Sequence, residues 1–149
     1  MKKILIIFSF LFVCFSISAQ TAVKNDFSFK APDATFSSNE MGDGYRSEEL
    51  KSSIQLNIFP ISYELIVKDV DKNVKDNMQI VSSEPRTIGG HKGYLQKVKL
   101  DGEGGFIGLS FFVASSEKET IVLHGSYPVA QDAMLFEKYI SAFETLAKE

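Results

Sequence analysis

Two histidines are the side chains in this sequence best suited to metal binding or proton transfer. His91 lies in a glycine-rich turn at residues 89–93, where we expect it to be exposed. His124 lies in an apolar segment, which favours a strand histidine with a structural hydrogen bond. A metal site would need both histidines to converge with an acidic side chain, and no short spacing supports one. The sequence therefore predicts no metal ligand and no bound cofactor.

Ser110 is the serine whose neighbours most resemble those of a nucleophile. Residues 108–112 (Gly-Leu-Ser-Phe-Phe) begin like the G-x-S-x-G elbow of hydrolases, but they end in phenylalanine and the strand continues. No aspartate lies between Ser110 and His124 to complete the usual chain order. The glycines of residues 102–108 precede a strand, so they indicate a hairpin turn and not a phosphate loop, which opens a helix. We therefore predict no catalytic residue and a protein that is not an enzyme.

The acidic stretch Asp69–Asn73 resembles the first half of an EF-hand calcium loop. The glycine and the glutamate that such a loop requires are replaced by Val74 and Ile80. The stretch also follows helical spacing, so we expect its charges to form the solvated face of a helix. Calcium binding is not predicted.

The first nineteen residues have the pattern of a secretory signal peptide. Lys2 and Lys3 precede an apolar run over residues 4–15 and small residues over 16–19, with cleavage expected after Ala19. The run is too short for a transmembrane anchor. A lipoprotein signal ending at Cys14 is disfavoured because bulky residues precede that cysteine. We expect a secreted or periplasmic bacterial protein with no stable membrane anchor after cleavage.

Length and charge limit the remaining possibilities. The chain has 149 residues, with 16 basic and 19 acidic side chains and a formal net charge of −3. We expect a flexible segment over residues 20–26 and a single domain over residues 27–149. Cys14 is the only cysteine, so a cleaved chain has no disulfide and no thiolate. Without a basic block, nucleic acid is not an expected partner, and we expect a monomer.

The N-terminal half combines short strands with turns. Alternation over Phe27–Lys30 predicts a strand, with Ala34–Ser37 as its possible hairpin partner. Residues 39–44 are rich in turn formers, and Ser53–Phe59 alternates clearly as a half-buried strand. Apolar spacings of three and four then predict a helix over about Ser62–Asn77.

The C-terminal half gives a more regular pattern. Pro85 restricts residues 79–88 to an edge strand or a bulge. Three strand-like segments over 94–100, 106–113 and 120–127, separated by turns, predict an antiparallel meander. A long helix is expected from Asp132, with an apolar stripe from Leu135 to Leu146.

Residues 106–113 are apolar on both faces, so we expect cover on both faces of the sheet. Together these elements predict an α+β domain with a mostly antiparallel sheet. The sheet is formed by an N-terminal hairpin and a C-terminal meander and is covered by helices.

Four short stretches resemble the PsbP-like family of small secreted or lumenal domains, which share a fold with a eukaryotic Ran-binding nucleotide-release factor. They are FSFKAP at 27–32, IGGHKGY at 88–94, LHGSYP at 123–128, and residues 136–146 of the last helix. The resemblance implies an antiparallel sheet sandwiched by helices and a non-enzymatic role in protein assembly or binding. Some members bind metal through scattered histidines and acids. No matching set occurs here, so the resemblance assigns no site residue.

Two hypotheses for function follow. The first is an exported, non-catalytic binding or assembly module of the bacterial envelope, whose partner is an unknown envelope protein. The alternative is a carrier that holds a small apolar ligand in a cavity between sheet and helix. A lipid that co-purifies with the protein would favour the carrier.

Overall fold

The computed structural model describes residues 21–101 and 104–148. The predicted signal peptide and its cleavage site lie outside the described residues. The elements in chain order are β1 (Thr21–Lys24), β2 (Phe27–Lys30), β3 (Ser37–Ser38), β4 (Gly44–Ser47), β5 (Ser52–Phe59), α2 (Tyr63–Asp69), β6 (Met78–Ile88), β7 (His91–Leu100), β8 (Phe106–Ser116), β9 (Glu119–Pro128), a 3₁₀ turn η1 (Val129–Gln131), α3 (Asp132–Glu144) and β10 (Ala147–Lys148).

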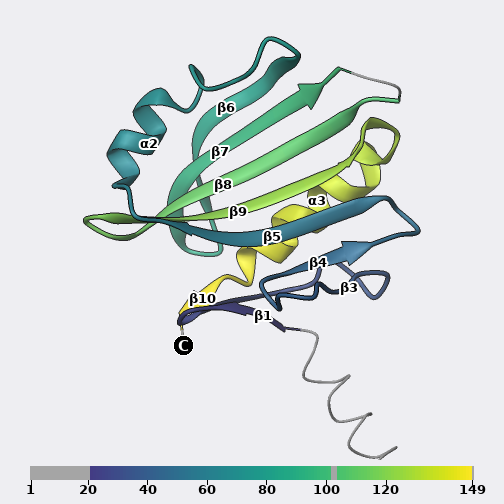
Figure 1. Ribbon diagram of the computed structural model, residues 1–149, viewed down its shortest axis with the longest axis horizontal. Helices are drawn as coiled ribbons and strands as arrows, with labels where there is room; N and C mark the ends of the chain where they lie inside the picture. The colour runs from purple at the N-terminus through teal and green to yellow at the C-terminus, as the bar shows by residue number, and fades with distance from the viewer. Residues whose placement is uncertain (1–20, 102–103, 149) are drawn as a thin grey trace, which may run out of the picture.

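The described chain forms two antiparallel sheets, as Figure 1 shows. The larger sheet has seven strands in the order β3-β4-β5-β9-β8-β7-β6, and the smaller has the order β1-β2-β10. The predicted meander is confirmed as β7, β8 and β9, and β6 extends it by one strand. The α+β class with a mostly antiparallel sheet is confirmed.

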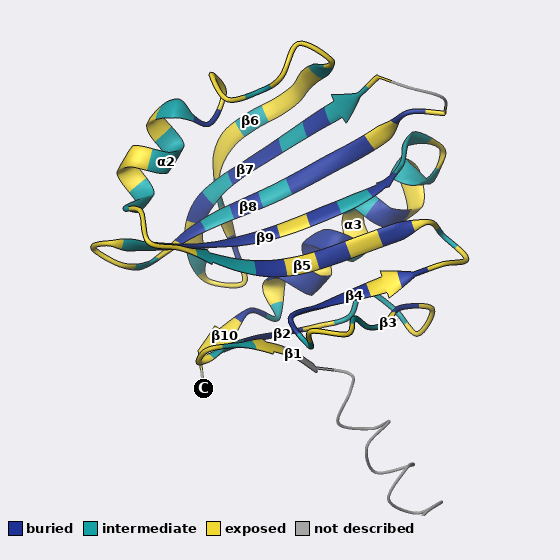
Figure 2. Cartoon of the chain, in the orientation of Figure 1, coloured by how far each residue is buried: buried dark blue, intermediate teal, exposed yellow. Residues whose placement is uncertain are grey.

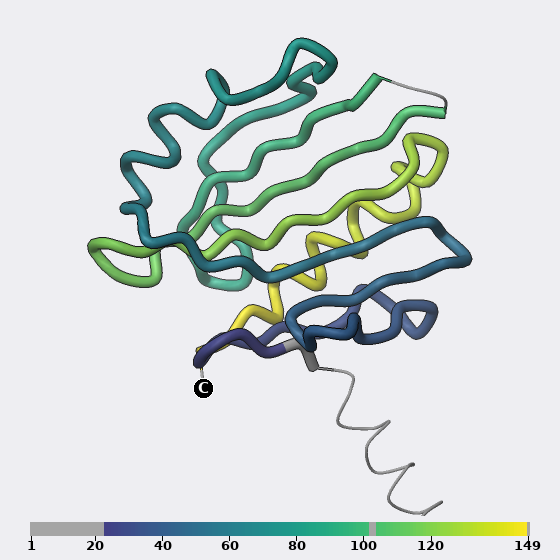
Figure 3. Tube along the Cα trace, viewed as in Figure 1, coloured from purple at the N-terminus to yellow at the C-terminus, as the bar shows by residue number. Residues whose placement is uncertain are grey.

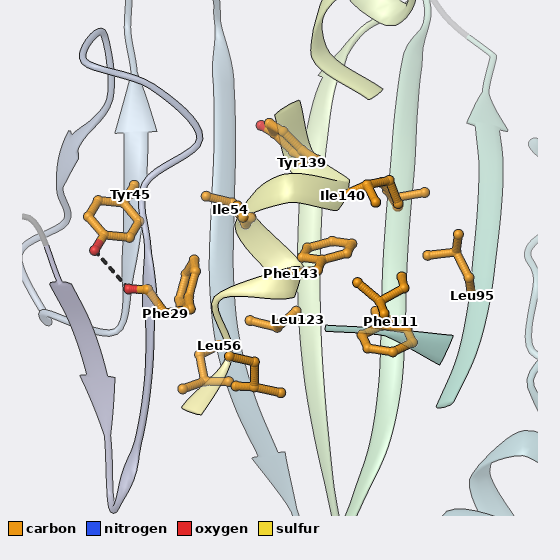
Figure 4. Close-up of a cluster of buried hydrophobic side chains, with 14 of the residues drawn as sticks. Phe29, Tyr45, Ile54, Leu56, Leu95, Phe111, Leu123, Tyr139, Ile140 and Phe143 are labelled. Atoms are coloured by element: carbon orange, nitrogen blue, oxygen red, sulfur yellow. Dashed lines mark hydrogen bonds between the residues drawn. The ribbon is translucent and has the colours of Figure 1, made fainter. Parts of the chain in front are cut away.

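Helix α3 packs against one face of the larger sheet, which we call the α3 face. Alternate strand residues point toward this helix, and they include Leu109 and Phe111 of β8, both 0% exposed. The rings of Phe111 and Phe143 stack with centroids 6.0 Å apart, as the close-up of the core in Figure 4 illustrates. A side chain at Gly125 would overlap the ring of Tyr139, so this strand position admits no Cβ without movement. The helix predicted from Asp132 is therefore confirmed, and its apolar stripe lies in the core.

The N-terminal segment differs from the sequence prediction. Residues 20–26 were expected to be flexible, but Thr21–Lys24 forms β1 and pairs with β2. The predicted hairpin partner Ala34–Ser37 does not pair with β2. The backbone N–H of Thr35 donates to Asp33 Oδ1 at 2.8 Å, and this local turn redirects the chain before it can form a ladder.

The second partner of β2 is the C-terminal strand β10. The first and last strands of the described chain consequently lie in one small sheet, on either side of β2, as Figure 3 illustrates. This pairing could not be predicted from local pattern, because β10 has only two residues.

The first predicted helix is also shorter than expected. It was predicted over Ser62–Asn77, but α2 ends at Asp69 and turns follow. The amide of Gln96 donates to the Asp71 carboxylate at 2.9 Å, which ties the chain after the helix to β7. Aspartate and asparagine in this stretch also compete with helical hydrogen bonds. The prediction that residues 79–88 form an edge strand or bulge is confirmed, because β6 is the outermost strand and has a bulge between Ile80 and Ser82.

The two faces of β8 are not equally covered. Phe106–Val113 was expected to be covered on both faces, yet Phe106 is 38% exposed and Phe112 is half-buried. Figure 2 shows this mixture of buried and half-buried positions along β8. The expectation is wrong for the face opposite α3, where a cavity separates the strand from α2.

Candidate functional site

The candidate site is a cavity of about 650 Å³ on the face of the larger sheet opposite α3. We call this the α2 face. Its floor is formed by β7, β8 and β9, and its roof by α2 and the turn that follows it. More than half of its lining residues are apolar, and they include Ile66, Val70, Met78, Val98, Leu100 and Phe112.

A row of polar side chains crosses this apolar floor. The strand registers place Gln96 beside Ser110 and Ser110 beside His124, on three adjacent strands. Because side chains alternate along a strand, these three residues share the α2 face. All three line the cavity, so the row forms a polar band across its floor.

Ser110 and His124 form a direct hydrogen bond at the centre of that row. The distance between Ser110 Oγ and His124 Nδ1 is 2.7 Å. In one tautomer the hydroxyl donates to Nδ1, and in the other Nδ1–H donates to the hydroxyl oxygen. Within the described residues His124 Nε2 has no hydrogen-bond partner. Either tautomer therefore leaves one donor and one acceptor of the pair open to the cavity.

His124 is open to the cavity but is surrounded by protein on the concave floor. Its side chain is exposed, and the protein atoms around it displace part of its hydration shell. This desolvation lowers the pKa of the imidazole below its ordinary value, because it disfavours the charged form. The neutral form of the imidazole is therefore favoured at pH 7.

The roof is held to the floor mainly by the turn after α2. Helix α2 has no buried residue, and Leu65 on it is 60% exposed. The carboxylate of Asp71 instead accepts hydrogen bonds from Gln96 at 2.9 Å and from Ser83 at 2.5 Å. The helix therefore contributes cavity wall and little core.

The Ser110–His124 pair lacks the surroundings of a hydrolytic nucleophile. Ser110 lies in the middle of β8, which is paired on both sides, so its backbone amides are taken up by the ladder. They are not available as the donors of an oxyanion hole. Among the described residues no carboxylate is hydrogen-bonded to His124.

No contact between Ser110 and His124 was predicted from the sequence. Both lie seven residues from Glu117, around which the β8–β9 hairpin folds. Folding the two predicted strands onto each other about this turn would have shown the pairing. The presence of a cavity on that face had no local sequence signal, because it depends on where α2 lies.

The structure places His91 elsewhere. It was expected to be exposed, but it is half-buried, and its Nε2 lies 2.8 Å from the carbonyl oxygen of Leu146. This contact joins the β6–β7 turn to the end of α3. No cluster of three potential metal ligands occurs within residues 21–101 and 104–148.

The acidic side chains of the stretch that resembles a calcium loop contact other residues of the protein. The Asp69 carboxylate lies 3.0 Å from Lys72 Nζ, and Asp71 binds Gln96 and Ser83. Asp69 is the last residue of α2 and Asp71 follows the helix, so the stretch does not form the solvated helix face that was expected.

Comparisons with known proteins identify the fold. No family model matches the sequence, and no curated protein matches it. Among solved structures, cyanobacterial PsbP from Synechocystis superposes with a TM-score of 0.53 at 11% identity, over 83% of this chain and 87% of the PsbP chain. The chain has a PsbP-like fold.

Two further structures share the PsbP-like fold. LpqN, involved in cell envelope biogenesis of Mycobacterium tuberculosis, matches with a TM-score of 0.51 and 12% identity, over 85% of this chain and 80% of LpqN. A protein from Bacteroides thetaiotaomicron matches with a TM-score of 0.56 and 14% identity, over 83% of this chain. The match spans only 45% of that longer chain. In the described ranges neither helix of this PsbP-like fold has the length and apolar character needed to span a bilayer.

Proposed function

We propose that this protein is a non-catalytic binding module outside the cytoplasm that holds a small, largely apolar ligand in the cavity of the α2 face. The observation that carries the proposal is the cavity itself, with a volume of about 650 Å³ and a mainly apolar lining. Small-molecule sites typically have volumes of roughly 300–1,000 Å³, apolar walls and a few placed polar groups. The Ser110–His124 pair supplies such polar groups.

Two observations support a non-catalytic role. The central strand carries Ser110 without an elbow, and its amides are committed to neighbouring strands. The neutral imidazole of His124 is paired with Ser110 through Nδ1 and has no carboxylate partner among the described residues. A site of this kind can orient a ligand but lacks the means to stabilise a tetrahedral intermediate.

The location outside the cytoplasm is supported by two independent arguments. The first nineteen residues have the signal-peptide pattern described above. In addition, the similar structure of LpqN belongs to a protein involved in cell envelope biogenesis.

Native mass spectrometry of gently purified protein tests the proposal. We expect a co-purifying small molecule, whose signal disappears in the Ser126→Phe variant because the ring fills the cavity that Ser126 lines. The Ser126→Ala variant is the matched control and should keep the ligand. A protein that carries no small molecule, and binds no apolar fluorescent probe, would contradict the proposal.

A second candidate function is the assembly role, in which an extended segment of an envelope protein pairs with β6. Strand β6 is one of the two edge strands of the larger sheet, and Ile80 and Val81 on it are 42% and 54% exposed. Exposed strand edges are common sites of strand addition. Affinity purification with Val81→Lys tests this role, with the exposed strand position Thr87→Lys as control. Equal recovery of proteins by both variants would argue against it.

A further inference from the structure

The charge of the cavity lining restricts the ligand more than its volume does. Asp69 and His124 are the only ionisable side chains in the described lining, and desolvation favours the neutral form of the His124 imidazole. Asp69 is negative and lies at the roof, where Lys72 pairs with it at 3.0 Å. The described lining includes no lysine and no arginine. A bound anion would therefore find no permanently charged cation in the described lining.

The polar row on the floor can form hydrogen bonds with an uncharged ligand. In either tautomer the Ser110–His124 pair offers one donor and one acceptor to the cavity. This matches a hydroxyl group, or a carbonyl group that accepts a single hydrogen bond. Gln96 is less available, because its amide nitrogen already donates to Asp71 and to the carbonyl oxygen of Val70.

The position of the pair indicates how such a ligand would lie. Ser110 and His124 are on the two central strands of the cavity floor, β8 and β9. Apolar neighbours flank them on the same face, with Val98 on the adjacent strand β7 and Phe112 two residues after Ser110 on β8. A polar head on the pair would therefore leave an apolar body in contact with hydrophobic walls.

We propose that the cavity selects an uncharged amphiphile, an alcohol or a carbonyl compound, whose single polar head binds the Ser110–His124 pair, and that it discriminates against carboxylates and phosphates. This inference rests on the proposed ligand-binding function and specifies its ligand class. The physical reason is that a charged head group that gives up hydrating water in the cavity gains no opposite fixed charge there, whereas a hydroxyl group gains a hydrogen bond.

Binding of 1-decanol and decanoate at pH 8, measured by displacement of an apolar fluorescent probe, tests the selection. The chains have equal length, and decanoate is fully ionised at this pH. We expect decanol to bind at least roughly tenfold more tightly than decanoate. Decanoate binding that equals or exceeds decanol binding would overturn the inference and leave the proposed function intact. If neither compound nor the probe binds, the proposed function fails as well.

Variants of the pair test where the head group binds. Ser110→Ala and His124→Leu should weaken decanol binding by about three- to tenfold, the effect of one hydrogen bond. His124→Gln keeps a donor and an acceptor and should retain more affinity than His124→Leu. Circular dichroism establishes that each variant is folded. Unchanged decanol binding in folded Ser110→Ala and His124→Leu would overturn the assignment of the head group.

A variant that adds the missing charge gives the converse test. Ser126 lines the cavity beside the polar row, so Ser126→Lys introduces a cation there. We expect it to increase decanoate affinity by about tenfold or more, whereas the matched Ser126→Ala should not. A Ser126→Lys protein with unchanged decanoate affinity would contradict the electrostatic explanation.

Discussion

The two faces of the larger sheet use the same strands for opposite purposes. On the α3 face Ile107, Leu109 and Phe111 of β8 are at most 3% exposed and pack in the core. On the α2 face Gly108, Ser110 and Phe112 of the same strand line an open cavity. Because side chains alternate, stability and binding are assigned to alternating positions of one strand. A substitution should therefore affect mainly one of the two properties.

The largest effect on the free energy of unfolding is expected from a substitution where α3 packs on the sheet. Phe143 is 0% exposed and stacks on Phe111, so Phe143→Ala should lower the free energy of unfolding by about 3–5 kcal/mol. The matched change on the other face, Leu65→Ala on the exposed roof helix, should cost less than about 0.5 kcal/mol. Urea unfolding followed by circular dichroism measures both. Similar losses in the two variants would remove the distinction between the faces.

Two glycines on opposite faces of the sheet allow the faces to be compared by adding a single methyl group to each. Gly125 approaches Tyr139 so closely that Gly125→Ala should destabilise the protein by about 2–3 kcal/mol. A Cβ at Gly108 would lie 3.1 Å from a methyl carbon of Val98 on the α2 face, where the open cavity allows movement. Gly108→Ala should therefore cost clearly less in thermal and urea unfolding. A larger cost for Gly108→Ala would mean that the cavity floor is rigidly packed.

The ion pairs of the two faces should also differ. Asp132 accepts from Lys97 Nζ at 2.8 Å and from the Tyr127 hydroxyl at 2.7 Å, in a partly buried position. Asp132→Asn should cost about 1–2 kcal/mol in urea unfolding. The corresponding Asp69→Asn in the exposed pair with Lys72 should cost less than about 0.5 kcal/mol. Equal costs would show that burial does not distinguish the pairs.

Acid titration of the same variant gives a second readout. Burial raises the pKa of Asp132, but the hydrogen bonds from Lys97 and Tyr127 outweigh it and hold that pKa below its ordinary value. The resulting stabilisation is present above the unfolded pKa and is lost as the pH falls through the folded pKa. The acid loss of stability below about pH 4 should therefore be smaller in Asp132→Asn than in the unchanged protein.

The smallest effect is expected from His124. Its folded pKa is lowered by desolvation, so the unfolded chain binds a proton more readily. The contribution of His124 to the free energy of unfolding is therefore fully present above the ordinary histidine pKa of about 6.5. It declines as the pH falls toward the folded pKa. Urea midpoints between pH 7.5 and 5 should fall slightly, and His124→Gln should reduce this slope. A slope that is unchanged in His124→Gln would contradict the assigned environment.

The sequence predicted the α3 face much better than the α2 face. The apolar stripe of α3 is a periodic pattern, and local periodicity sets which side chains face the core. The length of α2 was overestimated because its end is fixed by the contact between Asp71 and Gln96, which are distant in sequence. The pairing of β2 with β10 was missed for the same reason.

The candidate site was only partly accessible to sequence analysis. Ser110 and His124 were both singled out, but their contact depends on the register of the β8–β9 hairpin. The cavity depends further on the separation between α2 and the sheet, which is a tertiary property. The residue types alone therefore indicated what each side chain can do chemically, but they did not indicate that the two form one site.

The alternation along β8 has a consequence for protein engineering. Positions 108, 110 and 112 can be exchanged without touching the layer that α3 seals, so the cavity could be re-lined to accept other guests. Substitutions at these few positions would then change which ligands the protein selects, while the residues between them would continue to stabilise the fold.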